Sequence, residues 1–186
     1  MGSSTKNILV IGFGRIGSNF VKRALAFDMN VYVYDPYVEK KKVKISGAIP
    51  VDNISENLSK MDAVTLHCPK NNETTDLFTK QEFDLMKKSS FIINCARGGI
   101  LNEEDLYEAL KNENISGAGL DVFDVEPTPS SNPLFKLNNV ILSPHIAGVT
   151  VESTIRMATE TVQNVLDVLD DKINQSVVVN NKEIGM

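Results

Sequence analysis

Lys6–Asp35, KNILVIGFGRIGSNFVKRALAFDMNVYVYD, is the most informative stretch of the chain. Its apolar run Ile8–Ile11 is typical of a buried strand, and three closely spaced glycines then lead directly into a helical pattern. A second apolar strand, Val31–Tyr34, ends at the acid Asp35. This order of strand, glycine turn, helix, strand and acid predicts a βαβ unit that binds a dinucleotide.

Each residue type in this unit has a physical role. Gly12 allows the tight turn, Gly14 lets the backbone approach a pyrophosphate, and Gly17 lets the helix pack close to the strand. The helix N-terminus offers free N–H groups and a partial positive charge to the phosphates. Asp35 can accept hydrogen bonds from both adenosine ribose hydroxyls and repels a 2′-phosphate. The sequence therefore predicts NAD rather than NADP as the cofactor.

Length, charge and cysteine content exclude several classes of protein. A length of 186 residues suits one large domain or slightly more, and a net charge of −5 argues against a nucleic-acid partner. The basic run Lys40–Lys44 is interpreted as the solvated face of a short helix. Two cysteines make no disulfide framework and no metal-binding pattern, so we expect a reducing cytoplasm and no metal. Without a long apolar window or a leader, neither a membrane span nor a signal peptide is expected.

Strands alternate with helical patterns along the rest of the chain. This alternation predicts an α/β fold: a doubly wound, mostly parallel Rossmann-type sheet with helices on both faces, in three αβα layers. After the opening unit, further strands are predicted at Ala48–Val51, Asp62–His67, Phe91–Cys95, Ile115–Leu120 and Val140–Leu142. Helices are predicted at Lys40–Ser46, Asn53–Lys60, Thr79–Lys88, Asn102–Lys111 and Thr150–Asp171, with a Pro-containing loop at Phe123–Asn139.

Unusual residues gather where the predicted strands end, which is where ligands bind in such sheets. Arg97, Glu126 and His145 each follow a different strand, so all three project toward the crevice of the pyrophosphate loop. Taken singly, each has an ordinary structural explanation: a helix cap, a loop acid before a proline, and a buried histidine. Their occurrence at successive strand ends favours a catalytic group.

The motifs GFGRIG, LHCPKNNET, INCARGG, GAGLDVFDVEP, NPLF and SPHIAG occur in this order. Together they resemble the cofactor domain of the D-isomer-specific 2-hydroxyacid dehydrogenases, a group that includes phosphoglycerate dehydrogenase and glyoxylate/hydroxypyruvate reductase. The resemblance runs from about Lys6 to Asn180. It implies an NAD-dependent oxidoreductase that acts on a small 2-hydroxy or 2-keto acid, and a homodimer, for which the loop Thr128–Leu137 and the helix after Asn102 offer an interface.

The resemblance also implies roles for individual residues. Arg97 binds the substrate carboxylate, His145 exchanges the hydroxyl proton, and Glu126 pairs with His145. This assignment agrees with chemistry, because imidazole is a proton donor near neutral pH and a guanidinium matches a carboxylate. The implied cofactor contacts are Arg15 and Ile16 at the pyrophosphate, Asp35 at the ribose, Cys68, Pro69 and Thr74 on the adenosine side, and Cys95, Ala96, Arg97, Asp121, His145 and Gly148 near the nicotinamide.

The resemblance also implies a second, substrate-binding domain, which we expect to be absent from this sequence. We expect a cofactor domain at residues 6–180 with tails at residues 1–5 and 181–186, of which Met1–Ser4 resembles an expression-vector remnant. The chain is then either an excised domain or a natural lone domain. Two functions stay open: a dehydrogenase domain, and an NAD(H)-sensing binding module of the same fold. The resemblance implies a substrate of the phosphoglycerate or of the hydroxypyruvate/glyoxylate type, and the sequence does not decide between the two.

Overall fold

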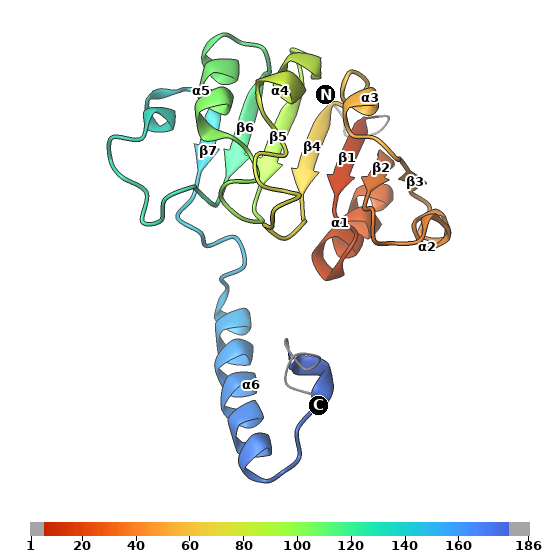
Figure 1. Cartoon of the computed structure of the whole chain (residues 1–186), viewed down its shortest axis with the longest axis vertical. Coiled ribbons are helices and arrows are strands. Elements are labelled where there is room, and N and C mark those ends of the chain that lie inside the picture. The colour runs from red at the N-terminus through yellow and green to blue at the C-terminus, as the bar shows by residue number, and fades with distance from the viewer. Residues whose placement is uncertain (1–5, 179–186) are drawn as a thin grey trace. The chain divides into compact units, whose positions relative to one another are not determined.

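The structure is a computed structural model that describes residues 6–178. A seven-stranded sheet lies at its centre, in the order β3-β2-β1-β4-β5-β6-β7, and every neighbouring pair of strands is parallel (Figure 1). The central β1 pairs with β2 on one side and β4 on the other, so the strand order reverses beside β1. The strands are β1 Asn7–Ile11, β2 Asn30–Tyr34, β3 Ile49–Pro50, β4 Ala63–Leu66, β5 Phe91–Asn94, β6 Gly117–Leu120 and β7 Val140–Leu142.

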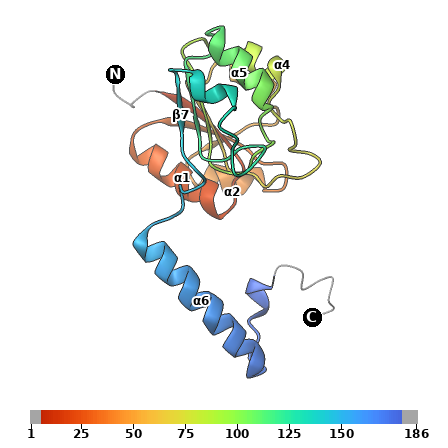
Figure 2. The same cartoon turned by 90° about the vertical axis from the view of Figure 1, so that its left-hand side faces the viewer.

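Helices cover both faces of this sheet, as Figure 2 shows. Alternate residues of β1 separate into two cores: Ile8 and Val10 pack with α1 and α2, whereas Leu9 and Ile11 pack with α3, α4 and α5. The predicted doubly wound, three-layer fold is confirmed. The helices of these layers are α1 Arg15–Ala26, α2 Lys40–Ile45, α3 Ser55–Leu58, α4 Lys80–Leu85 and α5 Glu103–Lys111.

Local signals in the sequence position the helix ends. The predicted start of α4 is confirmed, because the Thr79 N–H donates to the Glu82 carboxylate at 3.0 Å. At α5, the Asp105 N–H donates to the side chain of Asn102 at 3.1 Å. The predicted loop at 123–139 contains one short 3₁₀ helix, η1 Pro133–Lys136.

The chain divides into two compact units, residues 1–145 and 146–186. The second unit contains α6 Val151–Leu169 and the 3₁₀ helix η2 Gln175–Val177. The structure confirms the predicted helix, and Thr150 caps it, since the Ser153 N–H donates to the Thr150 hydroxyl at 3.1 Å. None of the residues of α6 is buried. The predicted tails and residues 179–180 of the predicted domain lie outside the described residues. Within residues 6–178, no helix combines the length and apolarity needed to span a bilayer.

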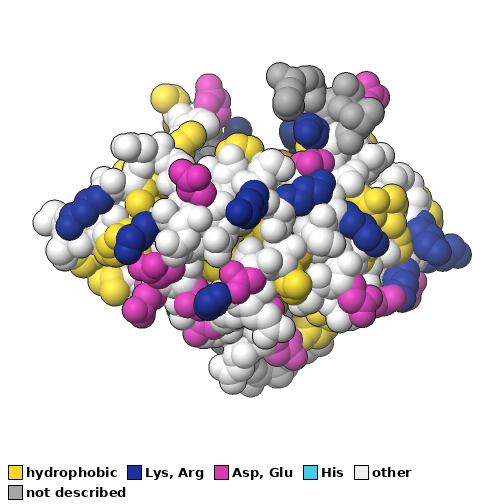
Figure 3. Space-filling model, turned by 90° about the horizontal axis from the view of Figure 1, so that it is seen from above, with side chains coloured by type: hydrophobic (Ala, Val, Ile, Leu, Met, Phe, Trp, Pro, Cys, Tyr) yellow, Lys and Arg dark blue, Asp and Glu magenta, His cyan; other side chains and the backbone are white. Residues whose placement is uncertain are grey.

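The strands point toward one edge of the sheet, and Figure 3 views the molecule from the opposite end. On the described part of that face, Lys and Arg side chains are interspersed with Asp and Glu, so no patch of a single sign forms there. The residues predicted to carry chemistry lie at the other edge, where the strands end.

Candidate functional site

At the carboxyl end of β1 the chain turns sharply into α1. Gly12 has a φ of +96°, and a Cβ there would stand 2.6 Å from the His67 carbonyl oxygen. A Cβ on Gly17 would stand 2.0 Å from the Gly12 carbonyl oxygen, so both positions require glycine. A Cβ on Gly14 would meet nothing within 4 Å. The turn therefore leaves open space at the N-terminus of α1, where the helix N–H groups favour an anion.

Asp35 follows β2 directly, and its carboxylate is fixed by the backbone. One oxygen accepts the Phe13 N–H at 2.7 Å, and the other accepts the Tyr37 N–H at 2.9 Å. Each oxygen keeps a second lone pair. The carboxylate is therefore held beside the glycine turn and can still accept hydrogen bonds from a diol.

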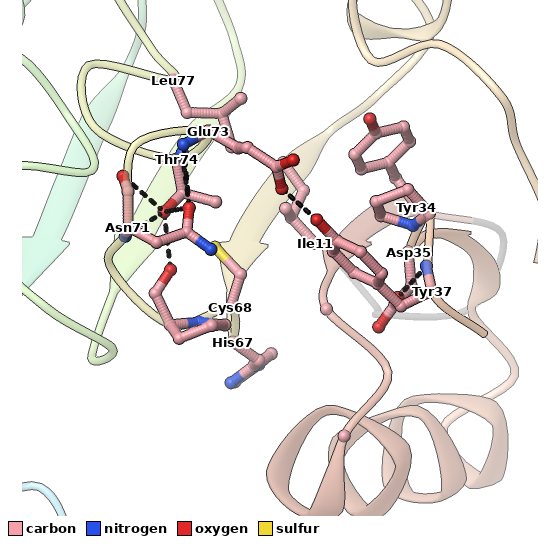
Figure 4. A pocket seen from close by; sticks show the side chains of 14 residues that line it. Ile11, Tyr34, Asp35, Tyr37, His67, Cys68, Asn71, Glu73, Thr74 and Leu77 are labelled. Carbon is pink, nitrogen blue, oxygen red and sulfur yellow. Dashed lines mark hydrogen bonds between the residues drawn. The ribbon is translucent and has the colours of Figure 1, made fainter. Parts of the chain in front are cut away.

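A cavity of about 500 Å³ lies between the loops that follow β1, β2 and β4 (Figure 4). The Thr74 hydroxyl donates to the Pro69 carbonyl oxygen at 2.7 Å and so orders the loop after β4. Of the predicted cofactor residues, the cavity brings together Gly12, Gly14, Asp35, Cys68, Pro69 and Thr74. Tyr37, Asn71 and Glu73 also line it and were not predicted.

A second cavity, of about 360 Å³, continues toward β5. It shares His67, Cys68 and Pro69 with the first cavity, so the two adjoin. The predicted residues that line it are Ile16, Cys68, Pro69, Cys95, Ala96 and Arg97. Arg15 is exposed at the first residue of α1 and lines neither cavity.

The loop that carries Arg97 depends on Asn94, which is not among the predicted site residues. Asn94 is buried, donates from its side chain to the Arg97 carbonyl oxygen at 2.9 Å, and accepts the Ala96 N–H at 3.0 Å. A Cβ on Gly98 would stand 1.8 Å from the Phe123 carbonyl oxygen, so this turn lies against the loop that follows β6. A buried amide that ends an apolar strand is a signal that could have identified Asn94.

Glu126 and His145 form a close pair at the ends of β6 and β7. His145 Nδ1 lies 2.7 Å from one Glu126 carboxylate oxygen, and the other oxygen accepts the Phe123 N–H at 3.0 Å. The hydrogen bond from His145 lowers the pKa of Glu126 most, and the Phe123 N–H and the Arg97 charge lower it further. Glu126 is therefore an ionised acceptor at neutral pH. Because Nδ1 donates to it, Nε2 is left to exchange a proton.

Asp121, directly after β6, is hydrogen-bonded to Ser143, directly after β7. It is buried and accepts the Ser143 hydroxyl at 2.6 Å. Burial raises the pKa of both cysteine thiols, and for Cys95 the Asp121 charge adds to the rise. Both thiols therefore stay protonated at neutral pH. Gly148 belongs to the second unit, so its predicted cofactor contact stays a prediction.

These features fit an extended ligand with a phosphate at its middle. The adjoining cavities run from the Asp35 carboxylate, past the open space over Gly14, to Arg97. A nicotinamide dinucleotide requires a carboxylate for its ribose and a helix N-terminus for its pyrophosphate. The Arg97 guanidinium at the far end can bind the carboxylate of a second ligand. The arrangement can therefore hold such a cofactor beside an Arg, a Glu and a His.

Comparison with known proteins agrees with this geometry. Residues 2–147 match the family model described as the D-isomer specific 2-hydroxyacid dehydrogenase, NAD binding domain. The chain is 43% identical over 173 residues to D-3-phosphoglycerate dehydrogenase of Methanocaldococcus jannaschii, a match that covers 93% of this chain and 33% of the relative. The chain thus spans about a third of the length of this relative.

Two solved structures have the same fold. D-lactate dehydrogenase from Aquifex aeolicus, complexed with NAD and lactic acid, superposes with a TM-score of 0.81 at 33% identity, over 90% of this chain and 54% of that one. The acyclic imino acid reductase Bsp5, in complex with NADPH and D-Arg, superposes with a TM-score of 0.82 at 34% identity, over 93% of this chain and 54% of that one. Similar domains therefore occur with either nicotinamide dinucleotide.

Proposed function

This chain belongs to the D-isomer specific 2-hydroxyacid dehydrogenase family, as an NAD-binding domain, and from that premise we propose that it serves hydride transfer between NAD(H) and a 2-hydroxy or 2-keto acid. The observation that carries the proposal is the Glu126–His145 pair, with 2.7 Å between its oxygen and nitrogen, at the same sheet edge as Arg97. A proton donor, its charge partner and a cation for a carboxylate are the groups that this chemistry needs.

Each of the three residues has a distinct part in the proposed reaction. The Arg97 guanidinium binds the substrate carboxylate and stabilises negative charge that develops on the neighbouring oxygen. His145 donates a proton from Nε2 to that oxygen when the acid is reduced, and accepts it in the reverse direction. Glu126 fixes the ring through Nδ1 and stabilises the imidazolium, in agreement with the lowered pKa of its carboxyl group.

The nicotinamide cofactor supplies or accepts the hydride when it is bound. The residues proposed to hold it are the glycine turn, Asp35 at the adenosine ribose, and Cys95 with Ala96 near the nicotinamide. The charge of Asp35 supports NAD over NADP, because a 2′-phosphate carries about −2 charge and would approach a carboxylate. We therefore propose NAD(H) as the preferred cofactor, although one similar structure contains NADPH.

The substrate is proposed only by class. A phosphoglycerate or hydroxypyruvate/glyoxylate type of acid remains our proposal, since similar proteins are named for different substrates. A homodimer, with the loop Thr128–Leu137 and α5 as candidate interface, is likewise a proposal. The chain covers a third to about a half of these proteins. We propose that it is a domain of a longer parent protein, in which another part closes over the substrate.

The test is NADH oxidation by the parent protein with a panel of 2-keto acids. We expect turnover with at least one acid, and a loss of at least about a thousandfold in kcat for His145→Ala. Arg97→Ala should raise KM as well as lower kcat, because it contacts the substrate carboxylate. A parent that binds NADH and turns over no 2-keto acid would contradict the dehydrogenase proposal and favour an NAD(H)-sensing module.

A further inference from the structure

The cavity of about 500 Å³ that Asp35 lines is named here the adenosine cavity. The loop after β2 and the loop after β4 face each other across it, and Tyr37 joins the two loops. Its backbone N–H donates to the Asp35 carboxylate at 2.9 Å, and its hydroxyl donates to the Glu73 carboxylate. Figure 4 shows the Tyr37 and Glu73 side chains meeting across the cavity. The two residues are 36 positions apart in the sequence, so this contact is not a local turn.

Glu73 is itself held in place within its loop. Its N–H donates to the Asn71 side chain at 2.9 Å, and the same side chain accepts the Thr74 N–H at 3.1 Å. The loop after β4 is therefore ordered by its own hydrogen bonds, whereas Tyr37 is 75% exposed and belongs to neither hydrophobic core. The contact between Tyr37 and Glu73 thus adds little to the packing of the fold.

The Tyr37 hydroxyl is a hydrogen-bond donor at neutral pH. The bond to Glu73 raises the pKa of Tyr37, so the hydroxyl keeps its proton through neutral and mildly basic pH. A hydroxyl that donates to an ionised carboxylate forms a charge-assisted bond, which is stronger than a neutral one. Both partners line the cavity that Asp35 lines, so the bond lies at the proposed adenosine site.

We propose that Tyr37 and Glu73 are positioning residues for the cofactor, a pair that we name the Tyr37–Glu73 clasp. The Tyr37 ring forms one wall for the adenine, which stacks favourably on aromatic faces, and the bond to Glu73 holds the ring at that wall. The clasp rests on the proposed NAD(H) site and deepens it. It assigns to Tyr37 and Glu73 a share of the cofactor affinity that the glycine turn and Asp35 do not supply.

The variants separate the ring from its hydrogen bond. Tyr37→Phe keeps the aromatic wall and removes the bond, so the affinity for NADH should fall about three- to tenfold. Tyr37→Ala removes both and should lower the affinity further. Glu73→Ala should match Tyr37→Phe, and the double variant Tyr37→Phe/Glu73→Ala should lose no more than either single variant, because both remove the same interaction.

The experiment is calorimetric titration of the wild type and these variants with NADH, with ADP and with nicotinamide mononucleotide. A clasp at the adenosine predicts the same loss for NADH and ADP, and no change for nicotinamide mononucleotide. Matched controls are Tyr32→Phe on β2 and Glu56→Ala on α3, two residues that do not line the cavity, and all variants should melt within a few degrees of the wild type. Unchanged NADH affinity in Tyr37→Phe, or additive losses in the double variant, would overturn the clasp. A wild type that binds neither NADH nor ADP would overturn the proposed function itself.

Discussion

Replacing Asp35 by asparagine keeps the shape of the side chain and removes its charge. In the wild type, the two carboxylate oxygens accept the Phe13 N–H at 2.7 Å and the Tyr37 N–H at 2.9 Å. Asparagine has one oxygen, so one N–H loses its acceptor and the other bond is no longer charge-assisted. Hydrogen bonds to charged groups contribute about 1.5–3 kcal/mol and neutral ones about 1 kcal/mol. With Asp35 half-buried, we expect the free energy of unfolding to fall by about 1–2 kcal/mol, or roughly 2–8 °C in Tm.

The effect on cofactor binding should be larger for NADH than for NADPH. Losing the carboxylate weakens the hydrogen bonds to both ribose hydroxyls, so we expect NADH affinity to fall about 10- to 100-fold. NADPH should lose much less or gain, because the repulsion of its 2′-phosphate is removed. Titration calorimetry with both cofactors at about 0.15 M salt measures this ratio, with salt fixed because screening changes it.

Asp28→Asn is the matched control for this substitution. Asp28 is exposed in the turn after α1, has a φ of 58°, and lies outside the adenosine cavity, and asparagine tolerates that backbone conformation. It should leave both affinities and Tm nearly unchanged. If Asp35→Asn bound NADH as tightly as the wild type, or still discriminated equally against NADPH, Asp35 could not be the ribose ligand and the reasoning would be refuted.

Four further predictions concern the turn, pH, assembly and turnover. Gly17→Ala places a Cβ 2.0 Å from the Gly12 carbonyl oxygen and should cost at least about 3 kcal/mol in urea unfolding, whereas Gly14→Ala should fold normally and weaken NADH binding; equal stabilities would contradict the account. Because its pKa is lowered in the fold, Glu126 stabilises the protein above the ordinary glutamate pKa and loses this contribution as pH falls through the lower folded value. The stability difference between wild type and Glu126→Gln should therefore shrink below about pH 4, and a difference that grows there would be evidence against the pair. We expect light scattering to detect a homodimer, and a monomer at high micromolar concentration would count against the interface. NADH oxidation by this chain alone should be at least about a thousandfold slower than by its parent, and comparable rates would mean that closure matters little.

Most of the fold could be predicted because its signals are local. Apolar runs bounded by turns marked all seven strands, and the connections between them are long enough for the crossovers that parallel pairing needs. Boundaries shifted where pairing decides the end of an element: β3 keeps only Ile49 and Pro50, the two residues that pair with β2. The sequence did not predict the short helix η1, because a proline such as Pro133 is typical of loops although it is also compatible with a first helical turn.

The candidate site was predictable in part, for a different reason. The residues proposed to face a ligand lie within the sequence motifs that carry the family resemblance. The structure brings two of them, Glu126 and His145, into contact. Tyr37 and Glu73 were missed because their hydrogen bond joins two loops that are 36 positions apart in the sequence. Asn94 was missed because its bonds to Ala96 and Arg97 depend on the conformation of one turn, which the residue pattern does not specify. Neither periodicity nor spacing encodes which side chain of one loop reaches another.

The central claim is that this chain holds a nicotinamide dinucleotide along the carboxyl ends of its strands, and a crystal structure of the chain grown with NADH tests it most directly. The account predicts the adenosine ribose hydroxyls on the Asp35 carboxylate, the pyrophosphate over Gly14 at the N-terminus of α1, and the nicotinamide end in the cavity lined by Cys95, Ala96 and Arg97. Cofactor bound elsewhere, or crystals grown with saturating NADH that contain none in these cavities, would contradict it.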